Sequence, residues 1–424
     1  MLTPLLEAAT AADPRRAAVR SGPDELSWGE VAALLATPAE EPPGRPVALP
    51  VTGTVADVAA LLRHAAAGRA VLVLDGAGTE WERERARALF APVGPAAGLC
   101  TSGTTGLPTV VPAPWPDLLA NARAFAVAAG IGQDGDGDGG GEVVWCGTPL
   151  HHRYCFAAGL LGGLAVGATV VLTPAVGPAD LTTRLLDERV TTVLSVPYLY
   201  GWYLRGLEQD PALIARWSLR RCVAAGAPLP PELARRWRRV TGLPLLSHYG
   251  STEDGQISVG TGEDDEGVGR VLPDREVRVD ATGEVLVRRR GAHAGPWRRT
   301  GDTGHLDAAG NLHLVGRLGD RLNIAGRKVD PTEVEDVLRT HPGVADCAVA
   351  AVPGSAGDEM AAFVVVDAAV GDAELRRHLT RVLSAYKLPR HLVRVAEVPR
   401  SRTGKVRRGA LVARLVTAPP ADAG

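Results

Sequence analysis

The sequence predicts an α/β fold: a large N-terminal domain of layered α/β subdomains with a small β-rich subdomain, followed by a small mobile α+β C-terminal domain. Three observations predict it. Apolar runs of strand length alternate with helical patterns along most of the chain. From about residue 256 to 316 the segments shorten, and strand patterns with Gly-containing turns dominate. A chain of 424 residues is also too long for one small core.

The N-terminal part contains the elements of a layered sheet. Before residue 99 we expect helices at 2–12, 27–37 and 54–68, with short apolar strands at 46–51 and 70–75. Beyond residue 142, five apolar runs predict buried strands, and helical segments separate them. The strands are expected at 143–150, 168–174, 190–197, 220–226 and 243–250, and the helices at 156–165, 180–188 and 230–240.

The C-terminal part restarts the alternation of helices and strands. The β-rich segment contributes strands at 275–280, 283–289 and 311–316. We therefore expect an N-terminal domain at 1–316, a hinge at 317–320 and a C-terminal domain at 321–424. The last domain is expected to contain helices at 331–341, 372–386 and 407–415, and strands at 345–353, 361–367 and 391–399.

Charge and composition exclude several classes of function. The formal net charge is −2, and both signs are mixed along the chain, which argues against nucleic acid or an anionic membrane as a partner. No run reaches the ~20 apolar residues of a membrane span. The five cysteines lack zinc-site spacing. The start, MLTPLLEAATAADPRR, has no basic stretch followed by a long apolar run, so we expect no signal peptide and a cytoplasmic location.

Several short segments have the chemistry of a nucleotide site. TSGTTG at 101–106 offers hydroxyls and glycines, whose backbone N–H groups can converge on phosphate oxygens. HYGSTEDG at 248–255 combines an aromatic ring, two hydroxyls and carboxylates. RRTGDTGHLD at 298–307 places Asp302 in a turn after a strand, where a carboxylate can accept ribose hydroxyls. Arg317 and the basic segment PRSRTGKVRR at 399–408 follow.

In this order the segments resemble the adenylate-forming superfamily, which comprises acyl-CoA and aryl-CoA synthetases, adenylation domains of peptide synthetases, and luciferases. The resemblance extends from about residue 99 to 412 and includes TSGTTGLP, TPLHHRYCF, VAAGAPLPPEL, YGSTE, RTGD, GRLGDRLNIAGRKVDPTEVE and PRSRTGKVRR. It implies an enzyme in which a carboxylic acid attacks the α-phosphate of Mg-ATP. The products of that step are an acyl-adenylate and pyrophosphate, and the C-terminal domain then rotates so that an acceptor can take the acyl group.

The resemblance also implies roles for individual residues. The β- and γ-phosphates are assigned to Thr101, Ser102, Gly103, Thr104, Thr105 and Gly106, and adenine to Gly226, Ala227, Pro228 and Tyr249. Thr252 is assigned to the α-phosphate, Glu253 to Mg²⁺, His152 to a gate near the acyl pocket, Asp302 and Arg317 to ribose, and Lys405 to the reacting carboxylate and α-phosphate. A positioned ammonium suits the last role because it offsets the repulsion between two anions.

The implied acceptor is a thiol, either coenzyme A or the phosphopantetheine of an acyl carrier protein. The segment HHRYCF lacks the Asp that would pair with an α-ammonium group, so we expect a carboxylic acid other than an α-amino acid. Cys155, Phe156 and Tyr198 are candidates either for an apolar acyl site or for the core. Two alternatives stay open: an amide synthetase with an amine acceptor, and a nucleotide-binding protein with degenerate catalysis.

Three features depart from the superfamily pattern. Thr109 stands where the phosphate loop usually has a lysine, Gly319 stands at the hinge where Asp or Lys is usual, and the segment before residue 99 is short. The loss of one charged hydrogen bond at position 109 corresponds to about 1–3 kcal/mol. We interpret Thr109 as a change that tunes ATP affinity, because Glu253, Asp302, Arg317 and Lys405 are all present.

Overall fold

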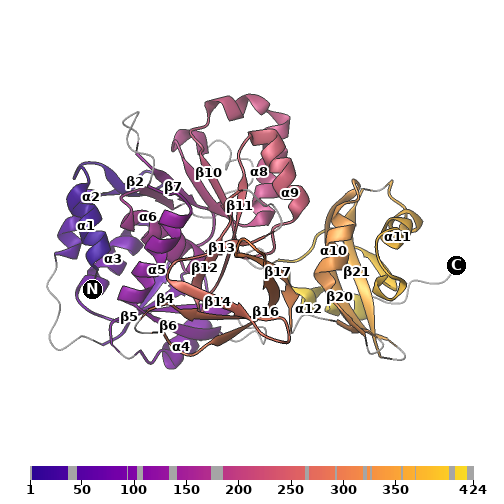
Figure 1. The fold of residues 1–424 in the computed structure, drawn as a ribbon. Coiled ribbons are helices and arrows are strands. Elements are labelled where there is room, and N and C mark those ends of the chain that lie inside the picture. Colours follow the sequence, from indigo (N-terminus) through magenta and orange to yellow (C-terminus); the bar gives the residue numbers. More distant parts are fainter. Residues whose placement is uncertain are drawn as a thin grey trace. The chain divides into compact units, whose positions relative to one another are not determined.

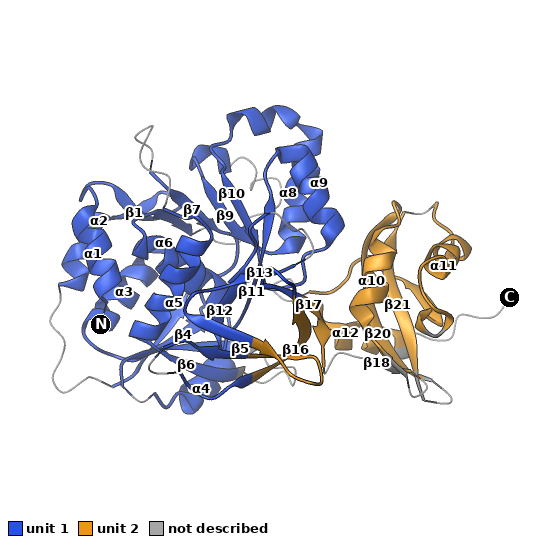
Figure 2. Ribbon diagram, in the orientation of Figure 1, with its two compact units in different colours: residues 1–277, 287–298, 307–313 blue, residues 278–286, 299–306, 314–424 orange. Residues whose placement is uncertain are grey.

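The computed structural model describes most of the chain. The described residues are 2–36, 45–92, 94–102, 108–132, 141–172, 185–262, 267–291, 294–318, 322–324, 327–354, 357–367, 369–400 and 406–417. They form two compact units (Figure 2): the first comprises residues 1–277, 287–298 and 307–313, and the second comprises residues 278–286, 299–306 and 314–424. The predicted phosphate-loop residues 103–107, the hinge residue Gly319 and Lys405 lie outside the described residues.

The first unit contains a mixed sheet of four strands in the order β3-β4-β5-β6. The first three strands are parallel, and β6 is antiparallel to β5. The strands are β3 (Val47–Val51), β4 (Val71–Asp75), β5 (Ala96–Ser102) and β6 (Pro108–Pro114), with helices α3 (Val55–Ala66) and α4 (Glu80–Leu89) in the connections. Both helices begin with a capping box, at Thr54–Asp57 and Thr79–Glu82, which satisfies the first backbone N–H groups.

A larger sheet of the first unit runs in the order β13-β12-β11-β10-β9-β7-β8-β1-β2 (Figure 1). From β11 to β1 the neighbouring strands are parallel. The strands are β1 (Ala17–Ser21), β2 (Asp24–Ser27), β7 (Val143–Cys146), β8 (Thr169–Leu172), β9 (Thr192–Ser195), β10 (Arg221–Ala224), β11 (Leu245–Ser251), β12 (Gly255–Val259) and β13 (Gly269–Val271). Every residue of β7, β8 and β9 is buried, as expected for parallel strands covered on both faces.

Helices cover this sheet and supply its core. They are α1 (Thr3–Ala11), α2 (Trp28–Leu35), α5 (Trp115–Ala128), the π-helix η1 (Tyr154–Leu161), α6 (Gly162–Ala165), α8 (Pro197–Gln209), η2 (Pro211–Arg216) and α9 (Pro231–Thr241). Figure 1 shows α8 and α9 beside β10 and β11, where Tyr200, Tyr203 and Trp237 form a buried aromatic cluster. Cys155 and Phe156 were candidates for the acyl site or for the core. Both belong to the main core of the first unit.

Strands β14 (Arg275–Val279), β15 (Glu284–Arg289), β16 (Arg298–Leu306) and β17 (Asn311–Arg317) form the predicted β-rich part, and their residues are divided between the two units. The rest of the second unit contains a three-stranded sheet in the order β20-β21-β22 and a hairpin of β18 and β19. Its elements are β18 (Leu322–Ile324), β19 (Arg327–Val329), α10 (Pro331–Arg339), β20 (Val344–Gly354), β21 (Gly357–Val366), α11 (Asp372–Thr380), η3 (Ala385–Lys387), β22 (His391–Arg394) and α12 (Arg408–Thr417).

The predicted α/β class is confirmed, with differences in detail. The elements that were not predicted include the hairpin of β1 and β2, the strands β5 and β6, and the helices α4, α5 and α8. The helix expected at 372–386 ends at Thr380, and the strand expected at 391–399 ends at Arg394. Within the described part of the chain, no helix is long and apolar enough to cross a membrane.

Candidate active site

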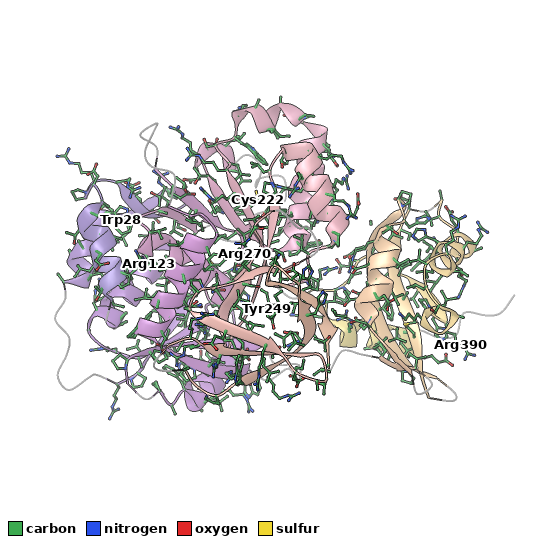
Figure 3. All side chains as sticks on the ribbon, in the orientation of Figure 1. Trp28, Arg123, Cys222, Tyr249, Arg270 and Arg390 are labelled. Atoms are coloured by element: carbon green, nitrogen blue, oxygen red, sulfur yellow. The ribbon has the colours of Figure 1, made fainter. Side chains whose placement is uncertain are left out.

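Parallel strands of the first unit bring several predicted residues to one edge of the sheet. β7, β9, β10 and β11 are neighbours, and the carboxyl ends of parallel strands meet at the same edge. Gly226, Ala227 and Pro228 follow β10, and Gly226 has φ +83°, a conformation that favours glycine. Tyr249, labelled in Figure 3, lies near the end of β11. Its side chain is 8% exposed. The residues assigned to adenine therefore come from adjacent strands.

The turn between β11 and β12 carries the two residues assigned to the α-phosphate and Mg²⁺. Thr252 is half-buried, and Glu253 is exposed. The Ser251 hydroxyl accepts a hydrogen bond from the Asp254 backbone N–H at 2.9 Å and donates to the Asp254 carboxylate at 3.1 Å. The turn is thus internally hydrogen-bonded, and it presents the Glu253 side chain to solvent.

His152 lies in the connection that follows β7. Its backbone N–H donates to the Pro149 carbonyl at 3.0 Å, and its ring centroid is 4.1 Å from that of His151. Nδ1 of His151 is 3.7 Å from the Asp75 carboxylate at the end of β4. Tyr198, in the first turn of α8 after β9, is 38% exposed at the same edge of the sheet. His152 and Tyr198 therefore follow neighbouring strands at the edge of the sheet where the predicted acyl site would lie.

Paired strands lie on either side of the predicted phosphate loop. In β5, the backbones of Thr101 and Ser102 pair with Thr109 and Pro108 of β6. The predicted loop residues Gly103, Thr104, Thr105 and Gly106 lie outside the described residues. The side chain of Thr109 is exposed. Its position in β6, opposite Thr101, places it beside the loop.

The second unit contains the pair assigned to ribose. Oδ1 of Asp302 is 2.8 Å from Nε of Arg317, and the Asp302 side chain is 14% exposed whereas that of Arg317 is 53% exposed. Asp302 lies within β16 rather than in a turn after a strand, so that expectation was wrong. The strand continues through Gly301, whose φ of +75° is a conformation that favours glycine.

The described residues on either side of Lys405 are firmly held in the second unit. Nη2 of Arg400 is 2.7 Å from the Asp346 carboxylate, and Arg400 pairs with Val406 in a β-bridge. Nη2 of Arg408 is 2.7 Å from the Glu335 carboxylate, and Nε of Arg408 donates to the Val349 carbonyl at 2.9 Å. Both ends of the segment 401–405 are therefore anchored to the sheet and to α10.

The sequence analysis missed three polar side chains under the turn of Thr252 and Glu253. Nη1 of Arg153 donates to the Thr252 carbonyl at 2.6 Å. Nη2 and Nε of Arg275 donate to the Asp254 carbonyl at 2.9 and 3.1 Å. Asn121 is fully buried in α5 and accepts from the Gln256 N–H at 2.8 Å. No sequence signal joins residues so far apart in the chain.

Burial also perturbs the protonation of groups near this edge. It lowers the pKa of the Arg153 guanidinium to about 10, and the positive charge of Arg275 contributes to the shift. It lowers the pKa of His248 to about 3, because the imidazole lies between Tyr154 and Phe125 with ring-centroid distances of 5.2 and 4.7 Å. His248 is therefore a neutral core residue at physiological pH.

Metal binding by the protein alone is not indicated in the described ranges. They contain no group of three or more His, Cys, Asp or Glu side chains placed to hold an ion. An exposed carboxylate at Glu253 beside the Thr252 hydroxyl suits Mg²⁺ that arrives with a nucleotide, because phosphates and water then supply most of the oxygen ligands.

Comparison with known protein families gives two matches. Residues 45–295 match the family described as AMP-binding enzyme, and residues 333–405 match the family described as AMP-binding enzyme C-terminal domain. The first match covers more than half of the 424 residues. Together the two matches account for most of the chain.

Two curated relatives illustrate the similarity. Triostin synthetase I of Streptomyces triostinicus is 32% identical over 352 residues, which are 74% of this chain and 64% of that protein. Sulfoacetate–CoA ligase of Cupriavidus necator is 29% identical over 354 residues, which are 75% of this chain and 66% of that protein. The chain thus spans just under two thirds of the length of these relatives.

Among solved structures, ATP-bound MatB from Rhodopseudomonas palustris superposes with a TM-score of 0.80 at 21% identity. The superposition covers 98% of this chain and 99% of that one. At this identity the likeness establishes a shared fold.

Proposed function

Because the chain belongs to the AMP-binding enzyme family, we propose that it activates a carboxylic acid with ATP as an acyl-adenylate and then transfers the acyl group to a thiol. The observation that carries the proposal is the edge formed by β10 and β11. There Gly226–Pro228, Tyr249 and the turn of Thr252 and Glu253 come together, as a nucleotide site requires.

In the proposed first step, a carboxylate oxygen attacks the α-phosphorus of ATP, and the bond to pyrophosphate breaks. The Thr252 hydroxyl is suited to donate to an α-phosphate oxygen, and the Lys405 ammonium is assigned to hold the carboxylate and the α-phosphate together. Glu253 would hold Mg²⁺, which neutralises charge on the phosphates when bound. Asp302, held by Arg317, would accept the ribose hydroxyls.

In the proposed second step, a thiol attacks the acyl carbonyl, AMP leaves, and a thioester forms. Coenzyme A is the favoured acceptor, because the relative from Cupriavidus necator is named as a CoA ligase. The phosphopantetheine of an acyl carrier protein has the same reacting thiol and is the second candidate. An amine acceptor would give an amide instead, and a degenerate homologue would bind ATP without either step.

Pyrophosphate release with a panel of carboxylic acids tests the proposal. We expect release that depends on one class of acid other than α-amino acids, and its loss in Lys405→Ala. Parallel reactions with coenzyme A, holo carrier protein or an amine then identify the acceptor by mass spectrometry of the product. ATP binding without acid-dependent release would favour the degenerate alternative, and release that persists in Lys405→Ala would overturn the role of that lysine.

A further inference from the structure

Three buried polar groups meet beneath Gly255, at the end of the turn that carries Thr252 and Glu253. A Cβ atom placed on Gly255 would lie 2.4 Å from Oδ1 of Asn121, 2.9 Å from Nη2 of Arg153 and 3.2 Å from Nη2 of Arg275. Gly255 has φ +81°, so both its conformation and its surroundings require glycine. The end of the turn therefore packs against two guanidinium groups and one amide.

The two arginines hold the backbone on both sides of Glu253. Arg153, from the N-terminus of η1, donates to the carbonyl of Thr252 at 2.6 Å. Arg275, from β14, donates to the carbonyl of Asp254 at 2.9 and 3.1 Å. Charged donors make stronger hydrogen bonds to carbonyls than neutral ones do. The backbone on both sides of Glu253 is thus held by contacts to the carbonyls of its two chain neighbours.

A second set of contacts fixes Arg275 and the first residues of β12. The Asp274 carboxylate accepts from Nη1 of Arg275 at 2.6 Å and from Nδ2 of Asn121 at 2.9 Å. Asn121 also donates to the Gln256 carbonyl at 2.9 Å and accepts from the Gln256 N–H at 2.8 Å. All of these residues belong to the first unit, so the network lies within one compact part of the chain.

This support contains two guanidinium groups whose charged form burial disfavours, which argues for a role beyond folding. Burial lowers the pKa of both guanidinium groups, and each lies in the positive field of a neighbouring arginine. Nε of Arg153 is buried and has no hydrogen-bond partner among the described residues. An ordinary turn can be held by neutral side chains, and unfavourable groups are characteristic of functional sites.

We propose that Arg153 and Arg275 are positioning residues for the adenylation step, because they fix the turn that directs Glu253 and Thr252 toward Mg-ATP. This inference rests on the proposed function. Groups that orient a ligating carboxylate typically change metal affinity or activity by about 10- to 100-fold when removed. The arginines act through the turn, without contact to the nucleotide.

The test compares Arg153→Met and Arg275→Met with a matched control. Arg238→Met also removes a part-buried arginine that donates to a backbone carbonyl, that of Gly262, elsewhere in the same unit. The first measurement is amide hydrogen exchange of residues 249–256 without ligand. We expect at least about tenfold faster exchange in the two test variants, and exchange equal to that of the wild type in the control.

The second measurement separates positioning from a general loss of folding. The Mg²⁺ concentration for half-maximal pyrophosphate release should rise by about tenfold or more in Arg153→Met, and Arg153→Lys, which keeps a cationic donor, should recover part of the loss. The rate of thioester formation from supplied acyl-adenylate should change by less than about twofold, because that step involves no attack on the α-phosphorus.

The outcomes distinguish this inference from the proposed function. Unchanged exchange in the turn, or equal losses in Arg153→Met and Arg238→Met, would overturn the positioning role. Faster exchange confined to the turn together with a raised Mg²⁺ requirement would support it. If the wild type releases no pyrophosphate with any acid, the proposed function fails, and the Mg²⁺ dependence of ATP binding then replaces release as the readout.

Discussion

His248 links the stability of the first unit to pH. The imidazole is 6% exposed and lies between the rings of Tyr154 and Phe125. Burial lowers its pKa from 6.5 to about 3. The unfolded chain therefore binds one more proton than the folded chain between these two pH values, and the free energy of unfolding decreases as the pH falls.

The size of the effect follows from the two pKa values. Above pH 6.5 the histidine is neutral in both states, and its contribution to the pH dependence vanishes. Each pH unit below that value destabilises the fold by about 1.4 kcal/mol, until the folded protein is itself protonated near pH 3. At pH 5 the loss relative to pH 8 is about 2 kcal/mol.

The variant His248→Phe removes the titrating group and keeps an aromatic ring in the stack. Urea unfolding followed by tryptophan fluorescence reports on the first unit alone, because all eight tryptophans lie in it. Between pH 8 and pH 5 the free energy of unfolding should decrease by about 2 kcal/mol more in the wild type than in the variant. Equal pH dependence of the two proteins would show that the pKa of His248 is the same in the folded and unfolded states, which would refute the reasoning.

Three further substitutions have defined outcomes. Thr109→Lys adds a charge beside the phosphate loop and should lower the KM for ATP by up to about tenfold without changing the ranking of acids; a new acid preference would contradict this. Asp302→Asn should raise the KM for ATP by about tenfold or more and remove the discrimination between ATP and 2′-deoxy-ATP; retained discrimination would exclude the ribose role. Gly255→Ala should destabilise the first unit by at least about 1 kcal/mol in urea unfolding, and unchanged stability would show that the turn tolerates a Cβ.

The parallel sheet could be predicted because its strands are continuous apolar runs. β7, β9 and β10 lie within the predicted segments, and the loops after them contain the predicted site residues. The hairpin of β1 and β2 was missed because its second strand is short and polar, DELS. Helix α4 has few apolar residues, but Thr79 and Glu82 have the spacing of a capping box and could have revealed it.

Prediction of the site was limited by its dependence on tertiary contacts. Gly226, Tyr249 and Thr252 could be predicted as site residues because each lies in a recognisable local segment. Arg153 and Arg275 lie in no such recognisable segment. Their guanidinium groups come close to Gly255 only in the folded chain, where the start of β12 lies near η1 and β14. A cationic support of this kind is visible in the folded chain and not in any one segment of the sequence.

Oxygen transfer from the acid tests the central claim most directly. The acid that supports pyrophosphate release is labelled with ¹⁸O in its carboxylate, and the products formed with a thiol acceptor are examined by mass spectrometry. If an acyl-adenylate forms, one carboxylate oxygen becomes the bridge to the phosphorus and leaves with AMP, so each AMP should carry one ¹⁸O. Unlabelled AMP, or label in orthophosphate, would contradict adenylate formation.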